Sequence, residues 1–462
     1  MTTSNITDMV LPENIRKVLD ILNNEGHNSF VVGGAVRDHL MGKTPNDFDV
    51  CTDALPNDVM KLFADYRIIE TGIKHGTVTV MINKTPIEIT TFRTEGLYTD
   101  NRHPDRIDFT TDIIKDLSRR DFTVNAIAYS PASGYVDPFG GMYDISNHVI
   151  RCVGDAEKRF SEDALRILRA LRFSSTLDFD IECITSRAIF KTSDNLCHIS
   201  KERIREELLK LICGDRASKI FTDYSSVFAL IIPGLKNTFD YDQNNPHHSF
   251  DLYTHLIKTV NNLPKDPILR MAGLLHDIGK PNTASKDESG ISHYYSHAKI
   301  SAEMAETILR DLRFSNNDIS RICSIILYHD GVIEENERAV KRRLNQLGSD
   351  KFFDLLELQR ADNASQTNDI AYRLEHNSIL RKISNNVIMR GDCVDASRLA
   401  LNGNDLISTG LKGKQIGKVL SFLLDAVING ETENTKEALS KLLAGNLDTF
   451  TNITQYDQGK DE

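Results

Sequence analysis

The segment from Phe30 to Val50, FVVGGAVRDHLMGKTPNDFDV, constrains the fold of the N-terminal part more than any other segment. It begins as an apolar run, breaks at Gly33 and Gly34, and ends with two carboxylates spaced by two, Asp47 and Asp49. Alternate side chains of a strand share a face, so a strand here would project both acids together. The segment therefore predicts a strand, a glycine turn, a helix start and a second strand that carries acids.

The paired acids indicate a divalent cation. Two carboxylates this close repel one another unless a cation lies between them, and hard oxygen ligands favour Mg²⁺, which can also bridge nucleotide phosphates. Glycines let the backbone approach a polyphosphate, the N–H groups of the following helix start would point at it, and Arg37 would pair with phosphate. A glycine turn followed by an acidic surface strand is the alternative.

The order of these features resembles the nucleotidyltransferase superfamily that includes DNA polymerase β, and GGAVRD resembles the class II tRNA nucleotidyltransferases and bacterial poly(A) polymerases. The resemblance implies a multidomain fold, in which an α+β nucleotidyltransferase head precedes all-α neck, HD and tail domains. We expect the head at residues 1–154, the neck at 155–222, the HD domain at 245–366 and the tail at 367–462.

A third acid and a loop follow the first motif. Residues 77–82 and 87–92 read as strands with a turn near residues 84–86, and Glu88 is a candidate third carboxylate if its strand lies beside that of Asp47 and Asp49. Glu88 could equally belong to a surface ion pair. The polar segment 91–109 reads as a loop, and the resemblance implies that such a loop serves the final addition of A, which favours full CCA addition.

The segment DLSRRDFTVNAIAY, residues 116–129, resembles the second motif of the same family. The resemblance implies that Arg119, Arg120 and Asp121 face the sugar and triphosphate and that Asn125 supports the site. Guanidinium groups match phosphate oxygens in bidentate geometry, which agrees with this assignment.

A helical pattern runs from about residue 154 to 214, and its segment RFSEDALRILRALRF places Asp163 and Arg166 three apart on one face of a single helix. Asp accepts from an exocyclic amine and Arg donates to ring acceptors, so the pair can hydrogen-bond the base edge of C or A. A surface ion pair is the alternative. EDALR resembles the family's EDxxR element, which implies a protein template for choosing CTP and ATP, and residues 199–212 resemble the last core motif.

The second half carries a different set of motifs. LLHDIGKP at residues 274–281, with an upstream histidine and a downstream aspartate, resembles the HD superfamily of metal-dependent phosphohydrolases. The resemblance implies that His255, His276, Asp277 and Asp362 bind a transition metal such as Mn, Fe, Ni, Co or Zn. A buried structural histidine is the alternative for each imidazole.

Two further histidines, His297 and His329, would complete a second metal site or position phosphate, and the sequence leaves both readings open. It also leaves open whether the HD domain hydrolyses anything. Residues 399–443 alternate glycine turns with apolar helices and resemble the tail of bacterial CCA-adding enzymes.

The net charge of −11 in 462 residues argues against a simple nucleic-acid binder, although residues 151–172 and 201–219 are locally rich in base. No apolar run reaches the roughly 20 residues of a membrane span, and the N-terminus lacks a signal-peptide pattern, so we expect a cytoplasmic protein. The scattered cysteines form no CxxC pair, which indicates free thiols rather than zinc sites or disulfides.

Together these features predict the addition of CCA to the tRNA acceptor arm from CTP and ATP, with two Mg²⁺ ions in the head. The alternatives are an enzyme that adds only CC or only A, a poly(A) polymerase, and an HD phosphohydrolase acting on RNA ends. A uridylyltransferase of nitrogen regulation would be longer and would leave EDALR unexplained. The oligomeric state stays open.

Overall fold

The computed structural model describes residues 8–45, 47–70, 72–95, 107–244, 250–366, 370–447 and 450. The chain divides into two compact units: residues 1–236 with 310–314, and residues 237–309 with 315–462. Most of the predicted loop at 91–109 lies outside the described residues, and only its ends appear, as β6 (Arg93–Glu95) and β7 (Ile107–Phe109).

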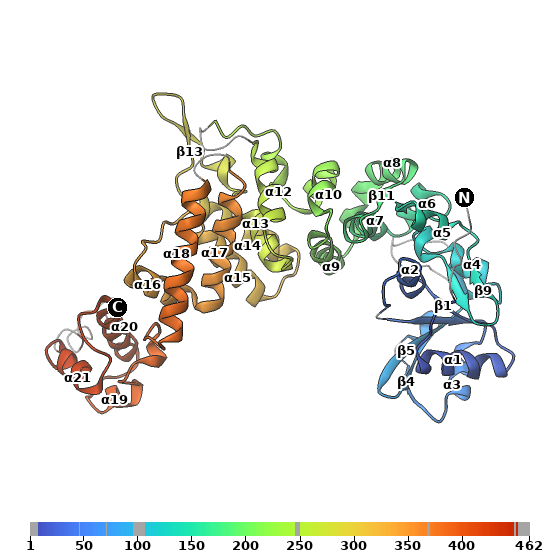
Figure 1. Cartoon of the computed structure of the whole chain (residues 1–462), viewed down its shortest axis with the longest axis horizontal. Coiled ribbons are helices and arrows are strands. Elements are labelled where there is room, and N and C mark those ends of the chain that lie inside the picture. The colour runs from blue at the N-terminus through green and yellow to red at the C-terminus, as the bar shows by residue number, and fades with distance from the viewer. Residues whose placement is uncertain are drawn as a thin grey trace, which may run out of the picture. The chain divides into compact units, whose positions relative to one another are not determined.

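The first unit is built on a mixed sheet, which has seven strands in the described part of the chain, in the order β3-β4-β5-β2-β1-β8-β9. Its strands are β1 (Ser29–Val32), β2 (Asp49–Thr52), β3 (Arg67–Ile69), β4 (Thr77–Ile82), β5 (Thr85–Thr91), β8 (Ala128–Ser130) and β9 (Gly134–Val136). In β4 the side chains of Val78, Val80 and Ile82 are buried, as alternation requires. Helices α1 (Glu13–Asn24) and α3 (Pro56–Leu62) lie against the sheet (Figure 1).

The strand register brings distant segments to one end of this sheet. β1 runs antiparallel to β2 with Val32 opposite Asp49, and β5 runs parallel to β2 with Glu88 opposite Asp49. β8 pairs with β1 so that Ala128 is opposite Val32. The Gly33 turn, the two acids and the segment that enters β8 are therefore neighbours.

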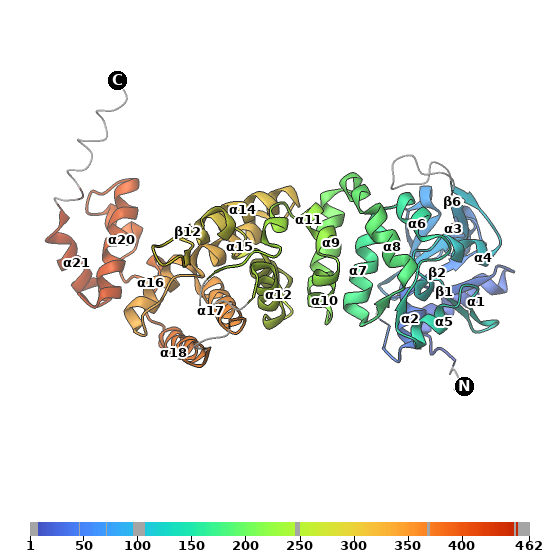
Figure 2. The ribbon, with the colours of Figure 1, turned by 90° about the horizontal axis from the view of Figure 1, so that it is seen from above.

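Helices make up most of the rest of the first unit: α2 (Gly34–Leu40), α4 (Ile113–Ser118), α5 (Gly141–Ser146), α6 (Ala156–Glu162), α7 (Leu165–Leu177), α8 (Cys183–Thr192), α9 (Lys201–Ile212), α10 (Ala217–Asp223) and α11 (Ser225–Ile231). Figure 2 shows α7, α9 and α10 side by side. The small strands β10 (Val149–Ile150) and β11 (Asp180–Ile181) form a parallel pair.

The prediction of one continuous helix through EDALR is wrong. α6 ends at Glu162 and α7 begins at Leu165, while the backbone of Asp163 is extended, with φ −141° and ψ 102°. The carboxylate of Asp163 accepts a hydrogen bond of 3.0 Å from the backbone N–H of Leu165. A short acidic side chain that bonds to nearby backbone competes with helix continuation, which explains the break.

The second unit is helical, apart from the hairpin of β12 (Ser285–Lys286) and β13 (Ser292–His293). Its helices are α12 (Leu252–Asn262), α13 (Pro267–Leu275), α14 (His297–Asp311), α15 (Asn316–Tyr328), α16 (Glu337–Leu347), α17 (Ser349–Asn363), α18 (Ile370–Met389), α19 (Gly403–Ile407), α20 (Lys414–Asn429) and α21 (Lys436–Ala444). Short 3₁₀ turns complete the chain at η1 (Ile73–His75), η2 (Thr123–Asn125), η3 (Ser193–His198), η4 (Leu235–Thr238), η5 (Lys280–Asn282) and η6 (Ala396–Arg398).

Helix α13 fixes the position of the HD motif. Asp266 caps its N-terminus by accepting from the backbone N–H groups of Ile268 and Leu269, and Pro267 occupies the first turn. The helix then buries nearly every residue, so its C-terminal end delivers His276 and Asp277 into the interior of the unit. Figure 1 shows α17 and α18 side by side in the same unit.

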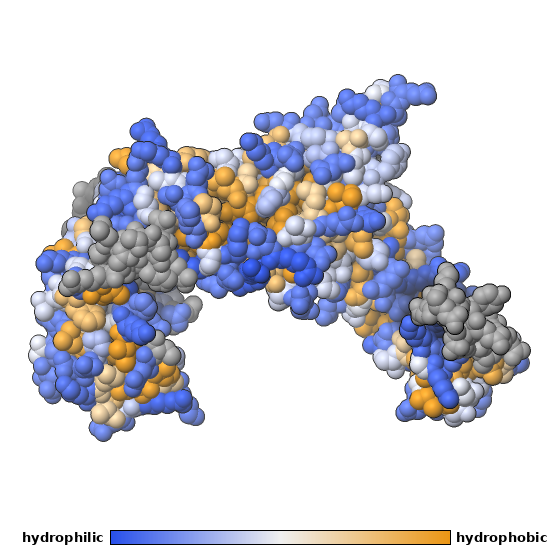
Figure 3. Space-filling view, turned by 180° about the vertical axis from the view of Figure 1, so that it is seen from behind, coloured by the Kyte–Doolittle hydropathy of each residue, from blue (hydrophilic) through white to orange (hydrophobic). Residues whose placement is uncertain are grey.

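No helix in the described part of the chain is long and apolar enough to cross a membrane. Hydrophilic residues alternate with hydrophobic patches over the face that Figure 3 draws.

Candidate functional site

The acids of the first motif lie at the end of the sheet where β2 begins. Asp47 precedes the strand, Asp49 opens it, and Glu88 faces Asp49 from the parallel neighbour β5, so the condition set for Glu88 is met. All three residues are exposed. Among the described residues, groups of three donors within 4.8 Å of one another do not include these acids, so they form an open site rather than a closed cage.

The surroundings of Asp49 favour a bound cation. Burial of the carboxyl group by its neighbours raises the pKa of Asp49, and the charge of Asp47 raises it further, while Arg120 opposes both effects. A divalent ion would relieve the repulsion between the carboxylates, so the donor set fits Mg²⁺.

Asp116 holds the arginines of the second motif and is a residue that sequence reasoning missed. It is fully buried and accepts from Arg119 at 2.9 Å and from Arg120 at 3.4 Å. Its carboxylate also accepts from the backbone N–H of Arg93 at 3.2 Å. The buried Nε of Arg120 has no hydrogen-bond partner among the described residues. The only hint in the sequence was the spacing of an acid three and four residues before two arginines, which are neighbours on a helix.

Arg120 also lies close to the glycine turn. Gly33 has φ +73°, and a Cβ at this position would lie 3.2 Å from Nη1 of Arg120. At Gly34 a Cβ would lie 3.6 Å from Nη2 of Arg37. The turn therefore lets two guanidinium groups approach the backbone at the end of β1.

Arg37 does not extend into open space as the sequence suggested. It is 8% exposed, donates to Asp38 at 2.7 Å and to Oδ1 of Asn125 at 2.7 Å, and lies over the ring of Phe173. Its role toward phosphate therefore remains a prediction, since the short neighbouring acid satisfies part of its charge.

Asp121 and Asn125 form a buried network behind the arginines. Asp121 accepts from Arg169 at 2.7 Å and from Nδ2 of Asn125 at 3.1 Å. Burial alone would raise the pKa of Asp121, but Arg169 and Asn125 outweigh it and lower the pKa to about 2. Asp121 thus joins the sheet unit to α7, and its predicted contact with the nucleotide is untested.

The two predicted base-reading residues have separate partners. Asp163 pairs with Arg203 of α9 at 2.7 Å. Arg166 is 9% exposed, pairs with Glu162 at 3.1 Å and donates to the backbone carbonyl of Arg119 at 3.1 Å. The structure thus places Asp163 and Arg166 beside the second motif without pairing them to each other, and Arg203 is a further residue that the sequence reasoning missed.

In the second unit the four predicted HD ligands converge. Nε2 of His255 lies 3.3 Å from Nε2 of His276 and 3.1 Å from Oδ1 of Asp362. Oδ2 of Asp277 lies 3.5 Å from Nε2 of His255 and 3.3 Å from Nε2 of His276. These donor atoms come from α12, the end of α13 and α17, and their nitrogen and oxygen chemistry fits a transition metal.

His297 and His329 approach the other oxygen of the same aspartate. Their Nε2 atoms lie 3.1 Å and 3.3 Å from Oδ1 of Asp277. Lys280 contacts Oδ2 of Asp277 at 2.7 Å. Groups of three donors that could hold a metal within the described residues include both His255 with His276 and Asp362, and His276 with Asp277 and His329.

The ionisation of this cluster reflects its crowded charges. Burial alone would lower the pKa of His276, but Asp277 and Asp362 outweigh it and raise the pKa to about 10. Burial would raise the pKa of Asp277, but Lys280 and His276 hold it well below its ordinary value. The pKa of Asp362 is likewise lowered, and that of His297 is raised by Asp277 against the effect of burial.

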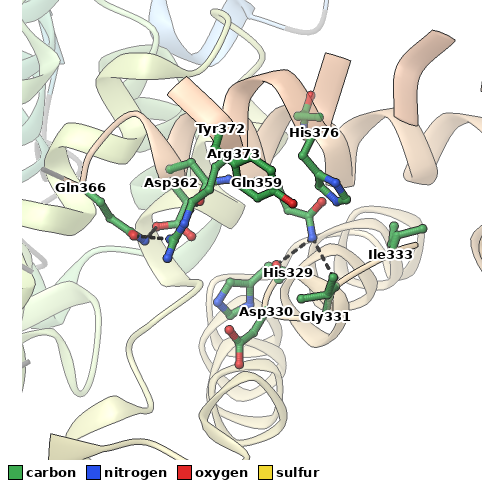
Figure 4. A pocket seen from close by; sticks show the side chains of 13 residues that line it. His329, Asp330, Gly331, Ile333, Gln359, Asp362, Gln366, Tyr372, Arg373 and His376 are labelled. Carbon is green, nitrogen blue, oxygen red and sulfur yellow. Dashed lines mark hydrogen bonds between the residues drawn. The ribbon is translucent and has the colours of Figure 1, made fainter. Parts of the chain in front are cut away.

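Two cavities open beside the cluster. One of about 350 Å³ is lined by residues that include Asp277, Lys280, His297 and Arg373. The other, of about 700 Å³, extends along α18 (Figure 4). Figure 4 shows Gln366 between Arg373 and Asp362, with hydrogen bonds to both.

Three family profiles match the chain. They are "Poly A polymerase head domain" at residues 29–151, "Probable RNA and SrmB-binding site of polymerase A" at residues 178–237 and tRNA nucleotidyltransferase domain 2 at residues 283–443. The first match contains the acids, the glycine turn and the arginines described above.

Relatives of similar length share much of the sequence. The CCA-adding enzyme of Leuconostoc mesenteroides is 33% identical over 428 residues, which are 92% of this chain and 94% of the relative. The CCA-adding enzyme of Geobacillus thermodenitrificans is 46% identical over 198 residues, which are 43% of this chain and 48% of the relative.

Solved structures agree over nearly the whole length. The Bacillus stearothermophilus CCA-adding enzyme in complex with CTP matches with a TM-score of 0.70 and 29% identity, covering 96% of this chain and all of that one. The Thermotoga maritima CCA-adding enzyme complexed with tRNA matches with a TM-score of 0.60, covering 94% of this chain and 96% of that one. Because its identity is 21%, that second match shows the fold alone.

Proposed function

The chain belongs to the family of CCA-adding enzymes, and from that premise we propose that it adds C, C and A to the 3′ end of tRNA from CTP and ATP. The observation that carries the proposal is the register of the sheet. It gathers Asp49, Glu88, the Gly33 turn and the arginine motif at one sheet end, where a nucleoside triphosphate needs acids for its metal and cations for its phosphates. The tRNA substrate favours the cytoplasm as the place of action.

Asp47, Asp49 and Glu88 would hold Mg²⁺, which supplies charge for the triphosphate and for the attacking hydroxyl when bound. In the reaction the 3′ oxygen of the tRNA bonds to the α-phosphorus, and the bond from that phosphorus to the β-bridging oxygen breaks. Pyrophosphate leaves, and the hydroxyl proton passes to solvent. The parallel pairing of β2 with β5 keeps Asp49 and Glu88 adjacent through this step.

Arg119 and Arg120 would contact the triphosphate. Their shared anchor, Asp116, is buried, so it orients both guanidinium groups without competing from the solvent side. Charge-assisted bonds from arginine to phosphate are about twice as strong as neutral ones. Gly33 and Gly34 leave the backbone clear where the phosphates would lie.

Asp163 and Arg166 would select the base. In the structure Arg203 occupies the carboxylate of Asp163, so a bound base would share or replace that partner. Arg166 is already oriented by its bond to the carbonyl of Arg119. The later helical segments would grip the acceptor arm mainly by its shape and backbone, as is usual for duplex RNA.

The test is incorporation by the purified chain into tRNA transcripts that end before CCA, after C and after CC, with each nucleoside triphosphate and Mg²⁺. Addition of C, C and A followed by a stop supports the proposal, and Asp49→Asn should abolish every step. Unlimited A addition would indicate a poly(A) polymerase, and A addition only to the CC-ended transcript would indicate a partial activity.

Base selection has its own test. The double variant Asp163→Ala with Arg166→Ala should relax the choice between CTP, ATP, UTP and GTP or abolish addition. The matched control removes the exposed ion pair of Glu157 and Lys191, which lies on α6 and α8 and should leave selectivity unchanged. Unaltered CTP and ATP selectivity in the first variant would refute the template role.

The convergence of His255, His276, Asp277 and Asp362 favours a second candidate function, a metal-dependent phosphohydrolase of the HD type in the second unit. One water would add across a P–O bond of a phosphate ester at an RNA end, giving an alcohol and a phosphate. We propose that Asp362→Asn abolishes hydrolysis of RNA ending in a 2′,3′-cyclic phosphate and leaves CMP incorporation intact. Asp49→Asn should do the reverse. Loss of both activities in either variant would mean a single site.

A further inference from the structure

Oδ1 of Asp277 is the least satisfied atom of the HD cluster. The residue is 2% exposed, and Oδ1 is buried without a hydrogen-bond partner among the described residues. The atoms that it faces are the Nε2 atoms of His297 and His329, at 3.1 Å and 3.3 Å. Oδ2 of the same carboxylate has Lys280 at 2.7 Å, so the missing positive charge lies on the Oδ1 side.

The histidines cannot supply that charge in their neutral forms. Nδ1 of His297 lies 2.8 Å from the carbonyl of Tyr294, and Nδ1 of His329 lies 2.7 Å from the carbonyl of Ile326. A carbonyl only accepts, so Nδ1 carries the proton and Nε2 of the neutral ring presents a lone pair. Two lone pairs then point at a carboxylate oxygen, which is repulsive unless a cation lies between them.

His276 follows the same rule on the other side of the cluster. Its Nδ1 lies 2.8 Å from the carbonyl of Gly273, so its Nε2 also presents a lone pair, toward Oδ2 of Asp277. Backbone carbonyls that fix the outer nitrogen are the usual orienting partners of metal-binding histidines.

We propose that the cluster binds two metal ions with Asp277 as the bridge: Oδ2 shares one ion with His255, His276 and Asp362, and Oδ1 shares the second with His297 and His329. This second ion goes beyond the single ligand set that the HD resemblance supplies.

The nitrogen spacings suit both positions. Nε2 atoms lie 3.3 Å apart in the pair His255 and His276, and 3.4 Å apart in the pair His297 and His329. With metal–nitrogen bonds of about 2.1 Å, these separations correspond to angles of about 104° and about 108° at the ion, close to tetrahedral. Both ions therefore fit without movement of the helices that carry the histidines.

The ligand class follows from the cavity beside the second ion, and this step rests on the proposed hydrolase function. Arg373 lines the same cavity as Asp277, His297 and His329. It donates to the neutral amide oxygens of Gln366 and Asn363, which do not cancel its charge. Two ions and a guanidinium around one cavity fit the dianionic phosphate of a phosphate ester.

The test is a count of bound metal in the full-length chain. All samples carry Asp47→Asn and Asp49→Asn so that the head contributes no ion, and they are stripped by chelator, loaded with Mn²⁺ and measured by elemental analysis. We expect two ions per chain and an exchange-coupled Mn²⁺ pair in the electron paramagnetic resonance spectrum. His297→Ala with His329→Ala should retain one uncoupled ion.

The matched control is His293→Ala, which removes an exposed histidine that pairs with Asp287 in the nearby hairpin, and it should retain two coupled ions. A single ion in the parent, or a count that is unchanged by loss of His297 and His329, would overturn the inference. The count is independent of turnover: two ions without hydrolysis would reject only the hydrolase, and hydrolysis with one ion would reject only the second site.

The phosphate part is tested with inorganic phosphate as the probe. Arg373→Gln should weaken its binding to the Mn²⁺-loaded chain by about 10-fold or more, as expected for loss of one charge-assisted bond, and should keep both ions. Unchanged phosphate binding would reject the role of Arg373.

Discussion

Replacing Asp116 by Asn tests whether one buried carboxylate organises the nucleotide-binding arginines. Asp116 is fully buried and holds Arg119 and Arg120 together. Asn keeps the size of the side chain and one acceptor oxygen, so the substitution removes the charge and little else.

The magnitude follows from the burial of the three groups. Removing one partner of a buried ion pair costs about 3–5 kcal/mol of unfolding free energy. The side chains of Arg119 and Arg120 are 16% and 20% exposed, so water offsets part of that loss, and we expect about 2–3 kcal/mol. The released arginines should also raise the KM for CTP and ATP by about 10-fold, the loss of one charge-assisted bond.

Urea unfolding and steady-state incorporation kinetics measure the two effects. The control is Asp58→Asn, which makes the same chemical change in an exposed pair with Lys61 and should alter stability by at most about 0.5 kcal/mol. If Asp116→Asn is as stable as this control and keeps the KM of the parent, the reasoning is refuted.

Three further changes have defined outcomes. The depressed pKa of Asp121, about 2 against an ordinary 3.8, means that its charge stabilises the fold above pH 3.8 and that this contribution is lost as the pH falls toward 2. Asp121→Asn should therefore destabilise by roughly 2 kcal/mol at pH 7, with a difference from the parent that shrinks in acid unfolding curves, and a pH-independent difference would contradict this. Gly33→Ala should lower the unfolding free energy by about 1–3 kcal/mol, because φ is +73° and the new Cβ would crowd Arg120; an unchanged urea midpoint would contradict it. Glu88→Gln should reduce CMP incorporation at least about 10-fold with an unchanged thermal midpoint, because the side chain is exposed beside Asp49, and full activity would exclude Glu88 as a ligand.

The sheet was predictable where the apolar pattern was strict. Strand β4 has the predicted bounds, Thr77 to Ile82, because alternate valines and the isoleucine pack inward. The following turn lies earlier than predicted, at Asn83 and Lys84, which both adopt positive φ. Asparagine tolerates that conformation, a local signal that the strand pattern outweighed.

The partners of the site residues were less predictable than the residues themselves. Asp163 pairs with Arg203, forty positions along the chain, and helix packing rather than local spacing brings them together. Periodicity also favoured one helix through EDALR and could not register the backbone bond that interrupts it. The histidines of the HD cluster were anticipated from resemblance, since their wide sequence spacing carries no geometric information.

The break between α6 and α7 changes what the EDALR segment can do. Within one continuous helix the distance between residues three apart is set by the helical pitch and can change only by unwinding. Because Asp163 is extended and Arg166 belongs to the next helix, torsions at a single joint set their separation. One pair of side chains can therefore meet the hydrogen-bonding edges of a pyrimidine and of a purine in turn, with the same two helices intact.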